Sequence, residues 1–140
     1  MADRQIAAND RGRRVIDDTL LLRQVHPAWV QAGRVTSQAF KPTPKDGKRL
    51  SVYDGDLISA AESWRHFTSE LGFASTGVMA VTVEECKKLD LSVEPDPKPF
   101  PSHAVIKFDD CSAAEIPKKA KYLKQFAESR GWLYQTETAE

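Results

Sequence analysis

The stretch "GVMAVTV", residues 77–83, decides the fold class. It is a continuous apolar run with the length and residue types of a buried strand, so we expect it in the middle of a sheet. Thr82 and Glu85 have the spacing of a capping box, which predicts a brief helix over "VEECKKLD", residues 83–90. The chain therefore places a buried strand directly before a helix.

Further strands are expected on both sides of this run. The first, Leu20–Val25, has a short helix as its alternative, because its apolar residues fix no period and Pro27 holds His26 extended. The other expected strands are "RVTSQAF" (34–40), "RLSVYD" (49–54), "LSV" (91–93), "HAVIKF" (103–108) and "WLYQ" (132–135), the last at a sheet edge.

Two longer helices have clear start and stop signals. The first begins with the capping box of Ser59 and Glu62 and ends at Gly72. The second begins with Ser112 and Glu115 and ends at Gly131. The expected buried stripes are Ala60, Trp64, Phe67 and Leu71 in the first helix, and Ile116, Ala120, Leu123 and Ala127 in the second.

These elements predict an α+β fold, because strands and helices mix without a regular βαβ alternation. We expect one domain over residues 15–140, with a mostly antiparallel sheet and about three helices. Residues 1–14 are charged and nearly free of large apolar groups, which predicts a disordered tail.

Composition and residue spacing restrict where the protein is expected to be located and whether a metal site is expected. The net charge is zero, no run approaches the ~20 apolar residues that span a bilayer, and the N-terminus lacks the apolar core of a secretory signal. Cys86 and Cys111 are isolated thiols. We therefore expect a cytoplasmic protein without a membrane partner. No metal site is expected, because none of the three histidines has a second ligand at metal-site spacing.

Positive charge gathers near the N-terminal third of the chain. Residues 1–50 carry a net charge of +5 and residues 51–140 carry −5. Part of the excess lies in a loop stiffened by Pro42 and Pro44. The loop cations are Lys41, Lys45, Lys48 and Arg49. A second proline-rich segment, "EPDPKPFPSH" (94–103), predicts an extended crossing over the surface that delivers the strand containing His103.

If the strands at 34–40 and 49–54 are neighbours, the basic loop hangs over one cleft. Phosphate pockets use cationic forks and hydroxyls, so this cleft predicts a nucleotide ligand. The candidate ligand-binding residues are Arg23, His26, Ser37, Lys45, Lys48 and His103. The candidate catalytic residues are Tyr53 and Glu62.

The segments "LLRQVHP", "GRVTSQAF", "LSVYDG" and "PFPSHAVIKF" resemble a family of small uncharacterised bacterial proteins. That family shares an R-x-[IV]-x-P start, an S-x-x-F middle followed by L-S-V, and a P-x-H-A strand. The order of "RQVHP" and "VYDGDLISAAE" is also similar to RES-domain toxins, although their glycine-rich "GGRWN" stretch is absent and the spacing from Tyr53 to Glu62 is shorter.

The second resemblance implies an ADP-ribosyltransferase-like fold that consumes NAD. It implies Arg23 as a dinucleotide contact, Tyr53 as a pocket aromatic and Glu62 as an acidic partner. The hypothesis is a protein of a toxin–antitoxin or defence locus that binds or acts on a nucleotide such as NAD. One alternative is a non-catalytic protein-binding module, such as an antitoxin, immunity protein or adaptor. Another is a nuclease or RNA-binding protein that uses His26, His103 and the basic loop.

Overall fold

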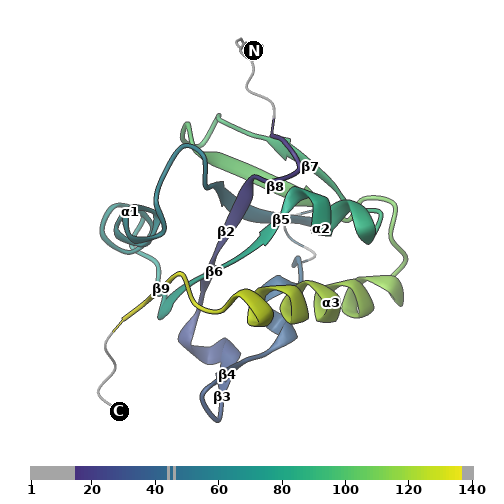
Figure 1. Ribbon diagram of the computed structural model, residues 1–140, viewed down its shortest axis with the longest axis horizontal. Helices are drawn as coiled ribbons and strands as arrows, with labels where there is room; N and C mark the ends of the chain where they lie inside the picture. Colours follow the sequence, from purple (N-terminus) through teal and green to yellow (C-terminus); the bar gives the residue numbers. More distant parts are fainter. Residues whose placement is uncertain (1–14, 44, 46, 137–140) are drawn as a thin grey trace.

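The computed structural model describes residues 15–43, 45 and 47–136 (Figure 1). The disordered tail expected over residues 1–14 lies outside the described residues, as do Pro44 and Asp46 of the basic loop. No helix in the described part of the chain has both the length and the apolar character needed to cross a bilayer.

The main sheet is antiparallel, with the strand order β7-β8-β5-β2-β6-β9. Its strands are β2 (Leu20–Val25), β5 (Arg49–Asp54), β6 (Gly77–Thr82), β7 (Ser92–Pro95), β8 (His103–Lys107) and β9 (Tyr134–Gln135). A separate small hairpin pairs β3 (Val30–Gln31) with β4 (Arg34–Val35).

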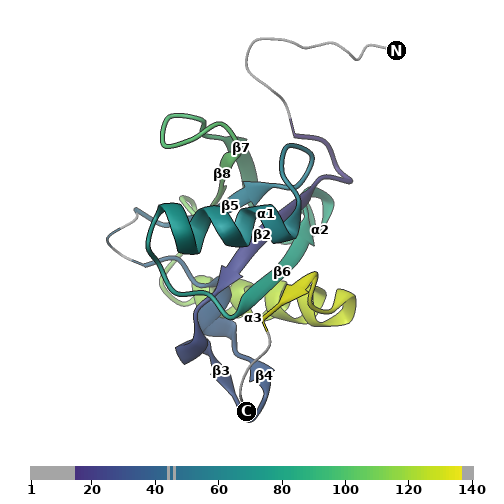
Figure 2. The ribbon, with the colours of Figure 1, turned by 90° about the vertical axis from the view of Figure 1, so that its left-hand side faces the viewer.

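Helices cover both faces of the main sheet. The α-helices are α1 (Ala60–Arg65), α2 (Val83–Lys88) and α3 (Glu115–Arg130). The other helical turns are the 3-10 turns η1 (Pro27–Trp29) and η2 (Ser37–Phe40) and the π-helical turn η4 (His66–Glu70). Figure 2 shows α1 across one face of the sheet and α3 on the opposite side.

The two faces bury different cores because side chains alternate along each strand. Met79 and Val81 of β6 join the larger core, where α3 contributes Leu123. Val78 and Ala80 of the same strand join the smaller core, against which the side chains of α1 and η4 pack. The smaller core lies beside the candidate site described below.

The predicted α+β class, with a mostly antiparallel sheet and three α-helices in the described chain, is confirmed. Strands β2, β5, β6 and β8 occupy the predicted segments, and β9 is an edge strand beside β6. Both reciprocal capping boxes form at the predicted residues of α1 and α2. Ser112 and Glu115 also exchange both hydrogen bonds, in the turn that leads into α3.

The strand predicted over residues 34–40 is wrong. Only Arg34 and Val35 are extended, and the 3-10 turn η2 follows. Ala39 and Phe40 are consecutive and both fully buried, which an alternating strand cannot achieve when only one of its faces is covered. The 3-10 turn directs both side chains into the core beside α3. The basic loop therefore joins η2 to β5 and does not connect two neighbouring strands.

The proline-rich surface crossing is also wrong. Pro95 is the last residue of β7, and the segment after it turns back directly into β8, so the prolines form the tip of a β-hairpin. The Asp96 amide donates to the His103 carbonyl over 2.9 Å, which closes this loop. Proline is tolerated here because β7 is an edge strand.

Leu71 does not complete the buried stripe of the first predicted helix. The π-helical turn over His66–Glu70 inserts an extra residue, and the Leu71 amide bonds the His66 carbonyl five residues back over 3.0 Å. Leu71 is consequently 39% exposed. The same turn leaves Phe67 only partly buried, at the edge of the smaller core.

Candidate functional site

A gap between β2 and β5 creates the candidate site. The two strands pair at Leu21–Asp54 and Leu22–Tyr53, and within the described residues no further pair between them follows. Figure 1 shows the two strands running in clearly different directions. The Arg23 side chain occupies the gap. Its Nε donates to the Ala39 carbonyl over 2.7 Å, and its Nη1 donates to the Ser51 carbonyl over 2.8 Å.

These bonds explain the position of Arg23. A main-chain carbonyl that loses its strand partner still needs a donor, and the planar guanidinium can serve two acceptors at once. The Trp29 ring lies 5.2 Å from the guanidinium carbon and adds a cation–π contact. Arg23 therefore substitutes for the missing part of the ladder.

A hollow of about 150 Å³ opens at this gap, and we call it the ring pocket. It lies between the sheet, the π-helical turn with the segment after it, and the tip of the β7–β8 hairpin. Its lining residues are Leu22, Arg23, Gln24, Ser51, Val52, Tyr53, Phe67, Leu71, Phe73, Phe100 and His103.

Aromatic rings dominate the lining. Phe100 packs on Tyr53 with ring centroids 5.0 Å apart and on His103 with centroids 5.1 Å apart. Phe67 and Phe73 form a second pair, with centroids 5.2 Å apart. These contacts form two groups of rings with defined relative orientations, Phe100 with Tyr53 and His103, and Phe67 with Phe73.

Tyr53 is fixed by a histidine behind it. Its hydroxyl lies 2.7 Å from His66 Nδ1, and Phe100 packs against the same imidazole. Burial, with a smaller contribution from the negative charge of Glu70, raises the pKa of Tyr53 above its ordinary value. The phenol therefore stays protonated at neutral pH, and its oxygen shares one hydrogen bond with His66 Nδ1.

His103 and Ser51 form a second polar pair in the lining. His103 Nε2 lies 3.1 Å from Ser51 Oγ, and its Nδ1 lies 2.9 Å from the Asp96 carbonyl oxygen. The Asp96 carboxylate is 3.3 Å from the same nitrogen. The His103 side chain is buried, whereas Ser51 is exposed.

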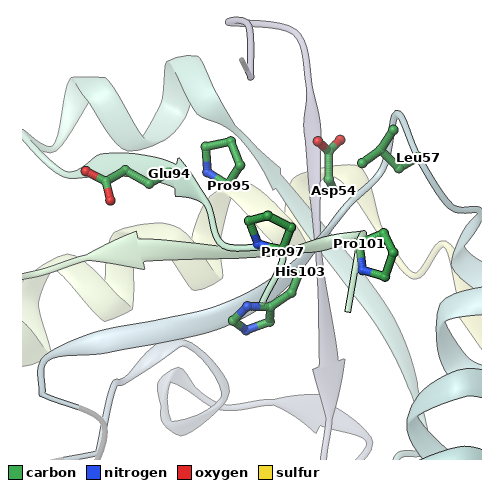
Figure 3. Close-up of a pocket in the computed structure, with 7 residues that line it drawn as sticks. All are labelled: Asp54, Leu57, Glu94, Pro95, Pro97, Pro101 and His103. Atoms are coloured by element: carbon green, nitrogen blue, oxygen red, sulfur yellow. The ribbon is translucent and has the colours of Figure 1, made fainter. Parts of the chain in front are cut away.

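A second hollow, the proline groove, has a volume of about 440 Å³ and shares His103 with the ring pocket. Figure 3 shows its seven lining residues, with three prolines around the opening and the His103 ring and the Asp54 carboxylate pointing in different directions. Asp54 and Glu94 supply two carboxylates, and no described lysine or arginine lines the groove. Asp54 Oδ1 accepts the Asp56 amide over 2.9 Å, as in a tight turn.

The structure brings three of the predicted site residues together. Arg23, Tyr53 and His103 all line the ring pocket. Glu62 does not line it, since its carboxylate caps the start of α1. His26 is exposed and caps η1 by accepting the Ala28 amide.

The remaining predicted ligand contacts lie elsewhere. Ser37 is half-buried in η2 and does not line the ring pocket. Lys45 is exposed, and Lys48 donates to the Cys111 carbonyl over 2.9 Å. The basic loop therefore contributes no described side chain to the lining of the ring pocket.

Sequence reasoning missed several residues of the site, among them Ser51, His66, Phe73 and Phe100. Ser51 and Tyr53 alternate on β5 and so share one face, a signal that was available in "RLSVYD". Phe100 lies between two prolines, and the surface crossing predicted for this segment gave no reason to expect Phe100 in a pocket. His66 and Phe73 depend on the π-helical turn and the segment after it, for which the sequence has no local signal.

Comparisons with protein-family models, curated proteins and solved structures find no match for this chain. Among the described residues, no cluster of three or more metal-ligating side chains is present.

Proposed function

We propose that this protein binds a small molecule through a flat ring that enters the ring pocket beside Ser51 and His103. The proposal rests on two aromatic contacts that line one hollow, Phe100 with Tyr53 and Phe67 with Phe73. Aromatic walls with a few convergent polar groups are typical of small-molecule sites.

Size restricts the ligand to a single ring or a small fused system. The hollow is about 150 Å³, and apolar cavities of roughly that volume hold one benzene-sized molecule. The rim is accessible, because Leu71 is 39% and Phe73 is 57% exposed. A ring that covers these two side chains removes apolar surface from water, which favours binding by roughly 25 cal/mol per Å².

Charge selects among ring ligands. The positive charge of Arg23 and the hydroxyl of Ser51 favour a polar or anionic substituent on the ring. The neighbouring proline groove carries the carboxylates of Asp54 and Glu94, which would repel a pyrophosphate. The proposed class is therefore a nucleobase, a nicotinamide-like amide or an aromatic carboxylate, in preference to an intact dinucleotide such as NAD.

The test is ligand-observed NMR with five probes: nicotinamide, adenine, benzoate, NAD and the acyclic amide isobutyramide. We expect saturable signals from at least one free ring compound and none from isobutyramide. Phe73→Ala should raise the Kd of that compound about tenfold, the loss of roughly 1.4 kcal/mol of contact. The control Tyr122→Ala, at an aromatic residue 53% exposed on α3, should leave the Kd unchanged.

Two results would contradict this function. One is the absence of binding by every ring compound, and the other is a Kd equal in wild type and Phe73→Ala. Stronger binding of NAD than of nicotinamide and adenine would instead favour the dinucleotide hypothesis. In that case Arg23 would be the first candidate for a phosphate contact.

Membership of a toxin–antitoxin or defence locus, and cytoplasmic location, stay predictions. A toxin that consumes NAD should arrest growth when expressed without a neutralising partner, whereas a ring-binding or protein-binding module should be tolerated. Measuring growth after induction, together with cellular NAD, separates these classes directly.

A further inference from the structure

The hydrogen bond between His103 and Ser51 has a defined polarity. His103 Nδ1 faces two oxygens of Asp96, the carbonyl at 2.9 Å and a carboxylate oxygen at 3.3 Å. Both are acceptors, so the proton of a neutral imidazole sits on Nδ1. Nε2 is then left with its lone pair and accepts the hydroxyl proton of Ser51 over 3.1 Å.

This arrangement is the one that activates a serine. A bare imidazole nitrogen within hydrogen-bond reach of the hydroxyl acts as its base, and a group on the other nitrogen fixes the tautomer. Phe100 packs edge-on against the His103 ring and helps to hold its orientation. Ser51 is exposed, so a reagent can reach its Oγ.

We propose that Ser51 is a nucleophile, with His103 as its general base, and that the site cleaves carboxylic esters. That the ester carries a ring rests on the proposed function, since the ring would occupy the ring pocket next to Ser51. Reactivity of Ser51 itself depends only on the Ser51–His103 geometry and can be tested without a ring.

The reaction balances without a cofactor. Ser51 Oγ bonds to the carbonyl carbon of the ester while its proton moves to His103 Nε2. The bond to the alcohol oxygen then breaks, and the alcohol leaves with that proton. Water gives its proton to Nε2 and attacks the acyl group, and Ser51 Oγ recovers a proton as the acid departs.

In this proposal Arg23 supplies a positive charge close to Ser51, the residue on which the tetrahedral intermediate forms. Its Nη1 is bonded to the carbonyl of Ser51, so the guanidinium is held next to the residue that attacks. A fixed charge near the tetrahedral intermediate lowers its energy without reorganisation during the step.

The first experiment treats the wild-type protein with diisopropyl fluorophosphate, which carries no ring and phosphorylates an activated serine with loss of fluoride. Intact mass and peptide mapping should show one adduct, on Ser51. Ser51→Ala should abolish the adduct, and Ser92→Ala, an exposed serine on β7, should not change it. His103→Gln should slow labelling by roughly 100-fold or more.

The second experiment compares hydrolysis of phenyl acetate and ethyl acetate. We expect the protein to hydrolyse phenyl acetate and Ser51→Ala to lose this activity. The ratio of the rates for phenyl acetate and ethyl acetate should be larger with the protein than with free imidazole. Since Ser51 is exposed, Ser51→Ala should keep the circular dichroism spectrum of the wild type, which confirms that the variant folds.

The outcomes separate the two proposals. Failure of the reagent to label Ser51 in the folded wild type overturns the nucleophile, even if ring compounds bind. Labelling of Ser51 without any preference for the phenyl ester overturns the ring-bearing substrate and leaves the nucleophile supported. Ring binding lost in Phe73→Ala while labelling of Ser51 persists supports both assignments, because Phe73 makes no hydrogen bond to the Ser51–His103 pair.

Discussion

Arg23 Nη1 donates to the main-chain oxygen of Ser51 over 2.8 Å at the point where β2 and β5 separate. The side chain of one strand thus replaces a ladder hydrogen bond of its neighbour. Two consequences follow for the site. The two strands stay separated beside the ring pocket, and the β5 backbone at Ser51 is fixed while the Ser51 hydroxyl lies 3.1 Å from His103 Nε2.

Arg23→Met tests the role of this side chain. It keeps the length and removes the donors to the Ala39 and Ser51 carbonyls, so we expect a loss of about 1–3 kcal/mol in the free energy of unfolding. Urea denaturation measures it. Arg23→Lys should recover only part of the loss, because an ammonium cannot reproduce the planar fork.

The matched control is Arg34→Met. Arg34 pairs with Glu128 over 3.2 Å, but its side chain is 74% exposed, so the change should cost less than about 1 kcal/mol. An equal loss for the two variants would mean that the bonds of Arg23 to the carbonyls do not hold the gap.

Leu123 tests the packing of α3 on the sheet. It is fully buried in the larger core with Met79 and Val81. Leu123→Ala should therefore lower the free energy of unfolding by about 2–5 kcal/mol, while its exposed neighbour Tyr122→Ala should change it by less than about 0.5 kcal/mol. An unchanged urea midpoint for Leu123→Ala would contradict this placement of α3.

Both cysteines should be unreactive in the native protein. Burial, helped by the charge of Glu85, raises the pKa of the Cys86 thiol to about 12, and Cys111 is buried as well. Reaction with 5,5′-dithiobis-(2-nitrobenzoate) at pH 8 requires a thiolate, so native protein should react slowly and both thiols should appear in denaturant. Rapid release of one equivalent from native protein would contradict the burial.

Glu85 should make the free energy of unfolding depend on pH in the acid range. Its burial alone would raise its pKa, but hydrogen bonds from Arg130 and Thr82 and the Arg130 charge bring the pKa below the ordinary 4.5. Because the unfolded state then binds the proton more readily, the contribution is complete above pH 4.5 and is lost as the pH falls through the lower folded value.

Urea midpoints of wild type and Glu85→Gln measured from pH 7 down to about pH 3 test this dependence. Wild type should be more stable than Glu85→Gln at pH 7, and the difference between their urea midpoints should shrink in the acid range. Glu84→Gln, one residue away and exposed, is the control, and its urea midpoint should differ less from that of wild type at pH 7. A midpoint difference between wild type and Glu85→Gln that stays constant with pH would rule out the Glu85–Arg130 contribution.

The parts of the fold that the sequence predicts well rest on local signals. Ser59 with Glu62 and Thr82 with Glu85 mark helix starts because the bonds that they form join residues three apart. The run at residues 77–83 identifies a buried strand by composition alone. The strand prediction for residues 34–40 failed because the burial of Phe40 depends on α3, about eighty residues later in the chain.

The site was less predictable than the fold. Arg23, Tyr53 and His103 are predicted site residues that all line the ring pocket, but the prediction also placed the cations of the basic loop beside them. That expectation required residues 34–40 and 49–54 to be neighbouring strands, and β5 instead lies between β2 and β8. Ser51 meets His103 only through the register of β5 against β8, which no local pattern encodes.

The most direct test of the central claim is a crystal structure of the protein soaked with the ring compound that binds most tightly in solution. We expect the ring between Phe100 and Phe73, with a polar substituent within hydrogen-bond distance of Ser51 Oγ or the Arg23 guanidinium. A ring bound only in the proline groove or on α3, with the ring pocket empty at saturating ligand, would contradict it.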